Sequence, residues 1–440
     1  MRIKGPARVK GSLSVPGDKS ISHRIAMLAS IAAGPSRVKG IASSADCNAT
    51  LDCIRKLGIR IEADPPDLVI HGEGLFGYRP LALPVRLNAG NSGSTIRMLS
   101  GLLAGQRFTS EIDGDPSLRR RPMARIIEPL GLMGARIEAA NGDFAPLTIQ
   151  GHSLKSINYA SPVASAQVKT CLLFAALLAS GRTTFFEPAQ SRNHTELMIK
   201  EFGAQFEKSS GLMSVEGLQE LSPLEYHVPG DLSSAAFFIA AATVLPDSSL
   251  LLRDVSLNPT RTAFIDLLNE LGARIEKQNA REQHGELVGE LAVSNRQLRS
   301  GPAGMLLSGA TIPNLIDEIP ILAVVATQVE GRIEVRDAKE LRIKESDRIR
   351  TVADGLRALG GKIEELEDGF AITGPQRLTG GRVQTHGDHR IAMAFAIAAL
   401  IADGTTEILD ADCAGVSFPE FYESLIGLTD ADTIAPLALD

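Results

Sequence analysis

Short, almost wholly apolar segments recur along the chain, and each opens with small or polar residues. These segments begin near Lys19, Asn91, Ser165, Asp231, Asp317 and Asp388, at similar separations. Segments such as 237–244 and 391–402 are apolar on nearly every side, which is typical of helices buried inside a domain. The pattern therefore predicts six buried helices.

A second phrase, apolar-Gly-x-x-apolar-Glu, recurs between these segments. Its glycines are Gly58, Gly134, Gly203, Gly272 and Gly360, and a truncated sixth copy ends at Gly427. Glycine readily adopts the left-handed backbone conformation that ends many helices, so a glycine directly after an apolar run indicates a helix end. Each phrase thus predicts a helix that ends at glycine and turns into a strand. Together the two series predict six βα-type repeats, each with one buried and one covering helix.

The phrase Val-Pro-Gly-Asp occurs twice, at 15–18 and at 228–231. If the chain crosses between domains at both places, residues 17–229 form a continuous domain. Residues 1–16 plus 230–440 then form a discontinuous domain. Each would hold three repeats, with a ligand cleft between them that closes by a hinge. The alternative is that two similar turns coincide by chance. Residues from about 429 onward are expected to form a loose C-terminal tail.

Composition limits the classes of ligand. The 440 residues carry a net charge of −7, no Trp and 4% aromatic residues, which disfavours wholesale nucleic-acid binding and base stacking. Four cysteines without a CxxC pair and eight histidines without an HExxH motif predict no metal site. No apolar run is long enough for a membrane span and the N-terminus has no signal-like apolar region, so we expect a cytoplasmic protein.

The stretch 15–24 joins a strand-like opening to the first buried helix. Asp18 or Ser20 can cap this helix, and its free backbone N–H groups attract anions. Lys19 lies at the same position, and Arg24 follows Ser20 by one turn. The stretch therefore predicts a binding site for phosphate and carboxylate groups. The alternative is a capped helix with two solvated cations.

Similar cations recur at the other helix openings. In the basic cluster 119–121, a solvated charged loop is the favoured interpretation of Arg119 and Arg120. A solvated helix face remains the alternative for the charged run 341–348, as does a simple helix cap for Asp317. Taken together, however, the cations predict a small polyanionic ligand. Asp317 and Glu345 lie among them and could transfer protons, with a nearby lysine keeping Asp317 ionised. The cations are Lys19, Arg24, Arg121, Arg192, Lys344, Arg348 and Arg390.

Seven motifs in order resemble the 5-enolpyruvylshikimate-3-phosphate synthase (EPSP synthase) family, and their form looks like its second class. The motifs are PGDKSISHR, GNSGSTIR, RRPM, SAQVK, PGDLSSAAFF, RIKESDR and GDHRIAMAFA, within about residues 5–428. The resemblance implies a two-domain inside-out α/β barrel of six βαβαββ repeats. It also implies transfer of the enolpyruvyl group of phosphoenolpyruvate to the 5-hydroxyl of shikimate 3-phosphate, in aromatic amino-acid biosynthesis.

The resemblance also implies residue roles. Asp317 matches the base for the 5-hydroxyl, Glu345 the acid that protonates the vinyl carbon, and Lys19 a further catalytic residue. The shikimate 3-phosphate positions are Lys19, Ser20, Arg24, Ser165, Ala166, Gln167, Arg192, Asp317 and Lys344. The phosphoenolpyruvate positions are Lys19, Asn91, Gly93, Arg121, Gln167, Arg348, His389 and Arg390. No cofactor, metal, nucleic acid or membrane partner is implied, and a monomer is expected.

The sequence departs from the first class at Val416, where that class has a lysine that contacts phosphoenolpyruvate. Gly93 favours sensitivity to the inhibitor glyphosate, whereas the second-class features favour the opposite, and the sequence does not decide. One rival is a sister enolpyruvyl transferase acting on a UDP-sugar, but the 119–121 loop lacks that family's reactive cysteine. Another rival is a non-catalytic anion-binding protein, which would not need Asp317 and Glu345.

Overall fold

The computed structural model describes residues 1–64 and 67–437. They divide into two compact α/β units, each with its own hydrophobic core. Unit 1 contains Met1–Pro16, Pro229–Arg281 and the chain from Leu287 onward, and unit 2 contains Gly17–Val228 and Glu282–Glu286. The chain therefore passes from one unit to the other inside each of the two Val-Pro-Gly-Asp phrases.

Unit 2 contains three four-stranded sheets with one strand order. In each, the first two strands are parallel and the next two pairings are antiparallel. The sheets are β16 (Glu225–His227), β3 (Ala33–Lys39), β5 (Asp67–Glu73) and β4 (Ile61–Asp64); β6 (Val85–Asn88), β7 (Thr109–Asp113), β9 (Phe144–Gln150) and β8 (Arg136–Ala140); and β11 (Asn158–Ala160), β13 (Arg182–Phe186), β15 (Leu212–Glu216) and β14 (Phe206–Ser209). A small pair, β10 (Leu154–Lys155) and β12 (Ala179–Ser180), is separate.

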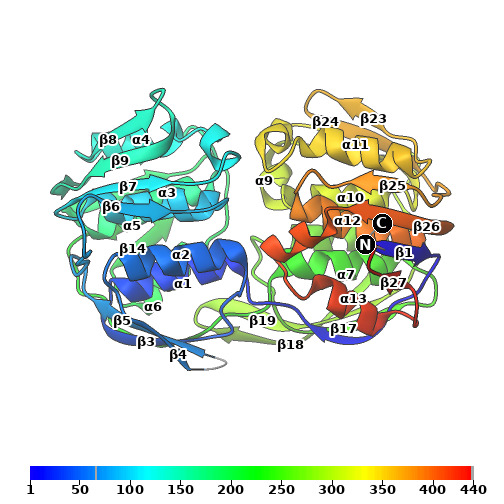
Figure 1. Ribbon diagram of the computed structural model, residues 1–440, viewed down its shortest axis with the longest axis horizontal. Coiled ribbons are helices and arrows are strands. Elements are labelled where there is room, and N and C mark those ends of the chain that lie inside the picture. The colour runs from blue at the N-terminus through cyan, green and yellow to red at the C-terminus, as the bar shows by residue number, and fades with distance from the viewer. Residues whose placement is uncertain (65–66, 438–440) are drawn as a thin grey trace. The chain divides into compact units, whose positions relative to one another are not determined.

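Unit 1 repeats this arrangement (Figure 1). Its sheets are β2 (Lys10–Ser14), β17 (Ser249–Ser256), β19 (Glu286–Ser294) and β18 (Arg274–Gln283); β20 (Leu298–Arg299), β22 (Val329–Val335), β24 (Gly369–Gly374) and β23 (Glu364–Leu366), with β21 (Met305–Leu307) also on β22; and β25 (Arg382–Gln384), β26 (Gly404–Leu409), β1 (Arg2–Gly5) and β27 (Ile434–Ala435). The N-terminal strand thus completes the sheet of the last repeat.

Each repeat has one buried and one covering helix, as the sequence predicts. The buried helices are α1 (Lys19–Ser30), α3 (Gly93–Ala104), α5 (Ala166–Leu177), α7 (Leu232–Val244), α10 (Ile319–Ala326) and α12 (His389–Ile401). The covering helices are α2 (Ala45–Lys56), α4 (Ala124–Leu132), α6 (His194–Glu201), α8 (Ala263–Glu270), α11 (Arg348–Ala358) and α13 (Phe421–Leu428). A short helix, α9 (Ile312–Leu315), precedes α10. The remaining helical turns are η1 (Leu118–Arg120), η2 (Gly309–Thr311), η3 (Lys339–Ile343) and η4 (Ala411–Val416).

The recurrent glycines end helices in five of the six repeats. Gly58, Gly134, Gly203, Gly272 and Gly360 have φ between 75° and 99°, the left-handed region that glycine adopts without strain. Gly427 differs from this prediction because it lies inside α13. No glycine cap is needed there, since α13 continues to Leu428.

The expected loose tail is also wrong for the described part of the C-terminus. β27 pairs with β1, with Ile434 opposite Ile3, and Ile434 is buried. Burial of this apolar side chain against the N-terminal strand anchors the segment. Residues 438–440 of the predicted tail lie outside the described residues.

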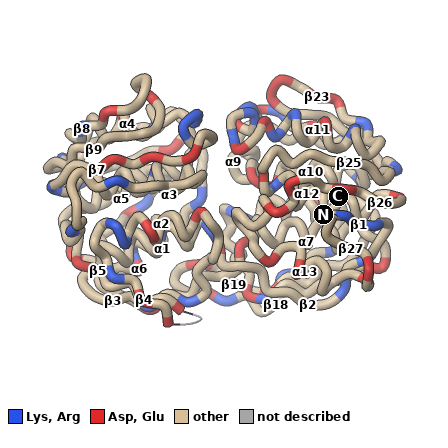
Figure 2. The backbone as a smooth tube through the Cα atoms, viewed as in Figure 1, with Lys and Arg blue, Asp and Glu red and all other residues tan. Residues whose placement is uncertain are grey.

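Among the described residues, no single helix combines the length and apolarity needed to cross a membrane; only a bent pair, Gly309–Leu315 with Ile319–Ala326 at 104°, has a suitable length and composition. Figure 2 shows Lys and Arg interspersed with Asp and Glu along the backbone of both units.

Candidate active site

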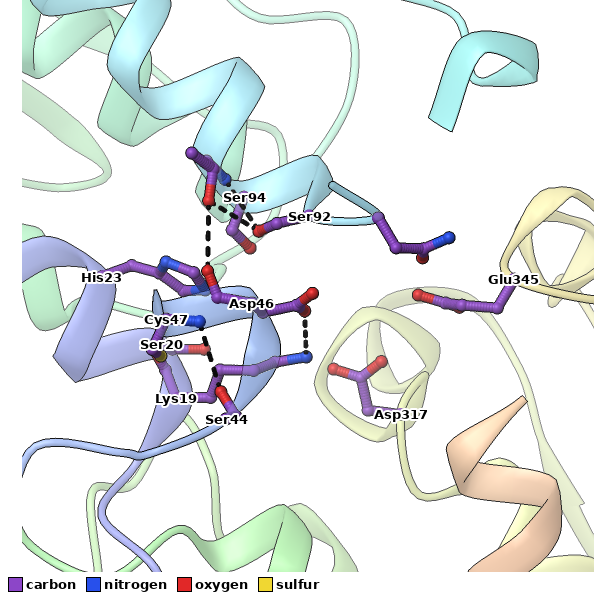
Figure 3. A network of polar contacts seen from close by, with 12 residues as sticks. Lys19, Ser20, His23, Ser44, Asp46, Cys47, Ser92, Ser94, Asp317 and Glu345 are labelled. Carbon is purple, nitrogen blue, oxygen red and sulfur yellow. Dashed lines mark hydrogen bonds and ion pairs between the residues drawn. The ribbon is translucent and has the colours of Figure 1, made fainter. Parts of the chain in front are cut away.

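Lys19 is the first residue of α1, and its charge has a carboxylate partner. Asp18 caps the helix by accepting a hydrogen bond from the Ile21 backbone N–H, at 2.9 Å. Lys19 Nζ lies 2.9 Å from Asp46 Oδ2 of α2, and its side chain is 20% exposed (Figure 3). The ammonium group is therefore held at the helix opening while still reaching solvent. Asp18, not Ser20, is the cap.

Arg24 is buried and bonded within unit 2. Its Nη1 donates to the Ser20 carbonyl oxygen at 2.7 Å, and its Nε donates to Thr195 Oγ1 of α6 at 2.8 Å. Its Nη2 donates to Thr170 Oγ1 and to the Ala166 carbonyl oxygen of α5. The sequence predicts a substrate contact for Arg24. The structure shows that it also joins the openings of α1, α5 and α6.

The other predicted shikimate 3-phosphate residues of unit 2 gather around these openings. Arg192 Nη1 donates to Ser20 Oγ at 3.0 Å. Ser165 caps α5, and Gln167 in its first turn accepts from Arg97 Nη1 at 2.7 Å and donates to Ser94 Oγ at 3.0 Å. Hydrogen bonds thus join the openings of α1, α5 and α6. The predicted residues at or beside these openings are Lys19, Ser20, Arg24, Ser165, Ala166, Gln167 and Arg192.

Three of the predicted phosphoenolpyruvate residues of unit 2, Asn91, Gly93 and Arg121, meet at the start of α3. Arg121 Nη2 donates to Asn91 Oδ1 at 2.8 Å, and only 8% of Arg121 is exposed. A Cβ on Gly93 would lie 3.0 Å from Arg97 Nη1 and 3.4 Å from Arg121 Nη1. The absence of a side chain at Gly93 thus leaves room for two guanidinium groups. The solvated-loop alternative is wrong for Arg121, whereas Arg119 is exposed and pairs with Asp113.

Arg348 organises the carboxylates of unit 1. Its Nη2 lies 2.6 Å from Glu345 Oε2, its Nε 2.8 Å from Asp388 Oδ2, and its Nη1 3.7 Å from Asp317 Oδ1. Burial acts to lower the pKa of Arg348, but these three carboxylates outweigh it and raise the pKa above its usual value. Burial acts to raise the pKa of Asp388, and the Arg348 charge reverses this so that the pKa is lowered. Arg348 is therefore a fixed cation, which contradicts the solvated-face alternative.

Asp317 is not the cap of α10. The cap position is Glu318, whose side chain makes no capping hydrogen bond. Instead Asp317 Oδ2 lies 3.6 Å from Arg390 Nη2, and its carbonyl oxygen accepts from Arg390 Nη1 at 3.0 Å. Two arginines, Arg348 and Arg390, thus lie beside Asp317 within unit 1, and the lysine that the sequence predicts there stays a prediction. His389 and Arg390 open α12 and are both buried.

Lys344 lies at the end of η3, where its Nζ is 3.5 Å from Glu340 Oε1. Val416, the departure from the first class, is half-buried in η4. Among residues 1–64 and 67–437, no group of three or more His, Cys, Asp or Glu could hold a metal ion.

The sequence assigns no role to three charged residues that the structure places in these clusters. They are Asp46 beside Lys19, Arg97 beside Gln167 and Asp388 beneath Arg348. Asp388 and Arg97 lie inside motifs that the resemblance rests on, but Asp46 has no local signal. Its partner is 27 residues away, and only the packing of α1 against α2 brings them together.

Comparisons with known proteins agree on one family. A family model described as EPSP synthase (3-phosphoshikimate 1-carboxyvinyltransferase) matches residues 3–425. Proteins of that name from Solibacter usitatus and Bacillus subtilis are 50% and 47% identical to the chain, covering 96% and 94% of it and 98% and 96% of their own lengths.

Solved structures agree with this. An EPSP synthase from Acinetobacter baumannii has a TM-score of 0.85 and 38% identity, with 97% of each chain covered. The enolpyruvyl transferase NikO from Streptomyces tendae shares the fold, with a TM-score of 0.77 at 17% identity over 98% of this chain and 97% of its own. With the paired carboxylates and clustered cations of the two units, these similarities show that the chain belongs to the EPSP synthase family.

Proposed function

We propose that this chain transfers the enolpyruvyl group of phosphoenolpyruvate to the 5-hydroxyl of shikimate 3-phosphate and releases phosphate. The observation that carries this assignment is the buried Arg348, which holds the two carboxylates Asp317 and Glu345 in one unit. An addition–elimination reaction needs one group that accepts the hydroxyl proton and one that protonates the vinyl carbon. Family membership supplies the substrates.

In the addition step, Asp317 takes the proton of the 5-hydroxyl group and the oxygen forms a bond to C2 of phosphoenolpyruvate. Glu345 donates a proton to C3, which becomes a methyl group. In the elimination step, a proton returns from that methyl group to Glu345 and the C2–phosphate oxygen bond breaks. The phosphate leaves with the proton that Asp317 had taken, so both carboxyl groups return to their starting state. Because Arg348 contacts both carboxylates, it fixes their orientation and balances their charge through both steps.

We assign the cations and helix openings to the anionic groups of the substrates. Lys19, Ser20, Arg24, Arg192 and Lys344 belong to the shikimate 3-phosphate positions, and the N-termini of α1 and α5 add favourable dipoles there. Ser165, Ala166 and Gln167 complete that set. The phosphoenolpyruvate set consists of Lys19, Asn91, Gly93, Arg121, Gln167, Arg348, His389 and Arg390. We propose that residues of both units act on one substrate pair.

The remaining features of the proposal follow from the resemblance and the composition. The reaction needs no cofactor, because phosphoenolpyruvate already carries its leaving group, phosphate. We propose that the enzyme acts as a cytoplasmic monomer of the shikimate pathway.

The test is to mix the protein with shikimate 3-phosphate and phosphoenolpyruvate and measure phosphate release. We expect phosphate release with this pair and no phosphate release when a UDP-sugar replaces shikimate 3-phosphate. Release only with the UDP-sugar would favour the sister transferase. Binding of both anions without release would favour a non-catalytic protein.

A further inference from the structure

A fully buried lysine lies between two predicted substrate-binding segments of unit 2. Lys169 of α5 has no exposed side-chain surface, and its Nζ is 2.9 Å from Glu187 Oε1 and 2.8 Å from Glu196 Oε1. Both carboxylates are also buried, with 3% of each side chain exposed. Lys208 Nζ lies 3.8 Å from Glu196 Oε1, so two lysines balance two glutamates.

These contacts hold the loop that carries Arg192. Glu187 begins the loop after β13, and Glu196 lies in the first turn of α6, where the loop ends. Ser191 in the middle donates from its Oγ to Glu187 Oε2 at 2.6 Å, and its carbonyl oxygen accepts from Lys169 Nζ at 3.4 Å. Lys169 Nζ therefore donates hydrogen bonds at the start and middle of the loop, to Glu187 and Ser191, and forms an ion pair with Glu196 at its end.

The same lysine is also joined to the α5 opening. Its backbone N–H donates to the Ser165 carbonyl oxygen at 2.9 Å. Arg192 follows Ser191 directly, and its side chain donates to Ser20 Oγ of α1. Lys169 thus fixes the distance between the α5 opening and Arg192, although it lies too deep to touch a substrate itself.

We propose that Lys169 is a positioning residue that sets the affinity for shikimate 3-phosphate through Arg192. This inference rests on the proposed function. A buried ion network is weak evidence for stability, because apolar side chains of similar volume often replace one without loss. Here the network has a further effect, because its contacts place the loop that carries Arg192.

The first variant is Lys169→Met. It should raise the KM for shikimate 3-phosphate by about tenfold to hundredfold, as expected when one charge-assisted hydrogen bond is lost. The KM for phosphoenolpyruvate should change by less than about twofold, since that set is held by Arg121 and Asn91. The matched control is Lys208→Met, which removes the same charge at the exposed edge of the network and should leave both constants unchanged.

Because Lys169→Met leaves two buried carboxylates unpaired, a second variant separates positioning from folding. The combination Lys169→Met, Glu187→Met and Glu196→Leu removes every buried charge and should restore thermal stability. The KM for shikimate 3-phosphate should nevertheless stay raised. In the background of Arg192→Ala, neither Lys169 variant should raise it further, because both changes remove the same contact.

A stably folded triple variant with an unchanged KM for shikimate 3-phosphate would overturn the proposal. An equal rise in both KM values would also overturn it, because it would indicate a general loss of structure. Absence of phosphate release by the unmodified chain would instead refute the proposed function, so the two failures are distinguishable.

Discussion

Arg348 Nη2 lies 2.6 Å from Glu345 Oε2, and the same guanidinium group contacts Asp388 and Asp317 while only 2% of its side chain is exposed. One buried cation thus pairs with three carboxylates from three different segments of unit 1. Two of these carboxylates are the proposed proton-transfer groups. The third, Asp388, is fully buried and caps α12, the helix that carries Arg390.

Replacing Arg348 by methionine should lower the free energy of unfolding by about 3–5 kcal/mol, because three buried or half-buried carboxylates lose their partner. Urea unfolding followed by circular dichroism measures this. The control is Arg350→Met on the same helix, an exposed residue paired with Asp354, for which about 0–1 kcal/mol is expected. Equal losses for the two variants would contradict the central role of Arg348.

Asp317→Asn should lower kcat by about 10²–10⁴, the usual contribution of a positioned base, while the KM values change little. The amide keeps the shape of the carboxylate but cannot accept the proton. Steady-state phosphate release measures both constants, with the exposed Glu330→Gln as control. A normal kcat would remove Asp317 from the mechanism.

Arg121→Ala should weaken phosphoenolpyruvate binding by about 2–5 kcal/mol, because a largely buried charged contact is lost. Its neighbour Arg120 is exposed, so the Arg120→Ala variant should bind phosphoenolpyruvate with unchanged affinity. Titration calorimetry in the presence of saturating shikimate 3-phosphate compares the two. If both variants bound phosphoenolpyruvate with similar affinity, Arg121 would instead be a solvated loop residue.

Gly93→Ala should raise the KM for phosphoenolpyruvate more than that for shikimate 3-phosphate. The added Cβ lies 3.0 Å from Arg97 Nη1, so this guanidinium group must move, and Arg121 is the next nearest group. Gly131→Ala in α4 is the control, because nothing lies within 4 Å of its Cβ position. Parallel changes in both KM values would contradict a local effect on the α3 opening.

His23 should make unfolding depend on pH. Burial, opposed mainly by the charge of Asp46, lowers its pKa from 6.5 to about 3. Below pH 6.5 the unfolded chain binds a proton that the folded protein does not accept until about pH 3. Stability is therefore lost as pH falls, by up to ~1.4 kcal/mol per pH unit from this group.

The variant His23→Asn removes this titration while keeping a polar partner for Thr50 Oγ1, which lies 2.7 Å from His23 Nδ1. Its free energy of unfolding should fall less steeply than that of the unmodified protein between pH 6 and pH 4, as measured by urea unfolding at a series of pH values. Identical slopes would show that His23 is already protonated in the fold.

The sequence by itself determined the features that depend on neighbouring residues. The apolar runs predicted all six buried helices, and five recurrent glycines marked helix ends because only a residue free to adopt positive φ continues the chain there. Asp18 and Ser165 were recognisable as candidates for helix openings for the same local reason.

Only the tertiary structure decided which distant groups meet. Lys19 pairs with Asp46, Arg24 joins three helix openings, and Lys169 holds the Arg192 loop through Glu187 and Glu196. β27 on β1 likewise joins the two ends of the chain. No local pattern encodes these contacts, because their energies arise when packed helices and sheets bring side chains from separate repeats into one buried environment.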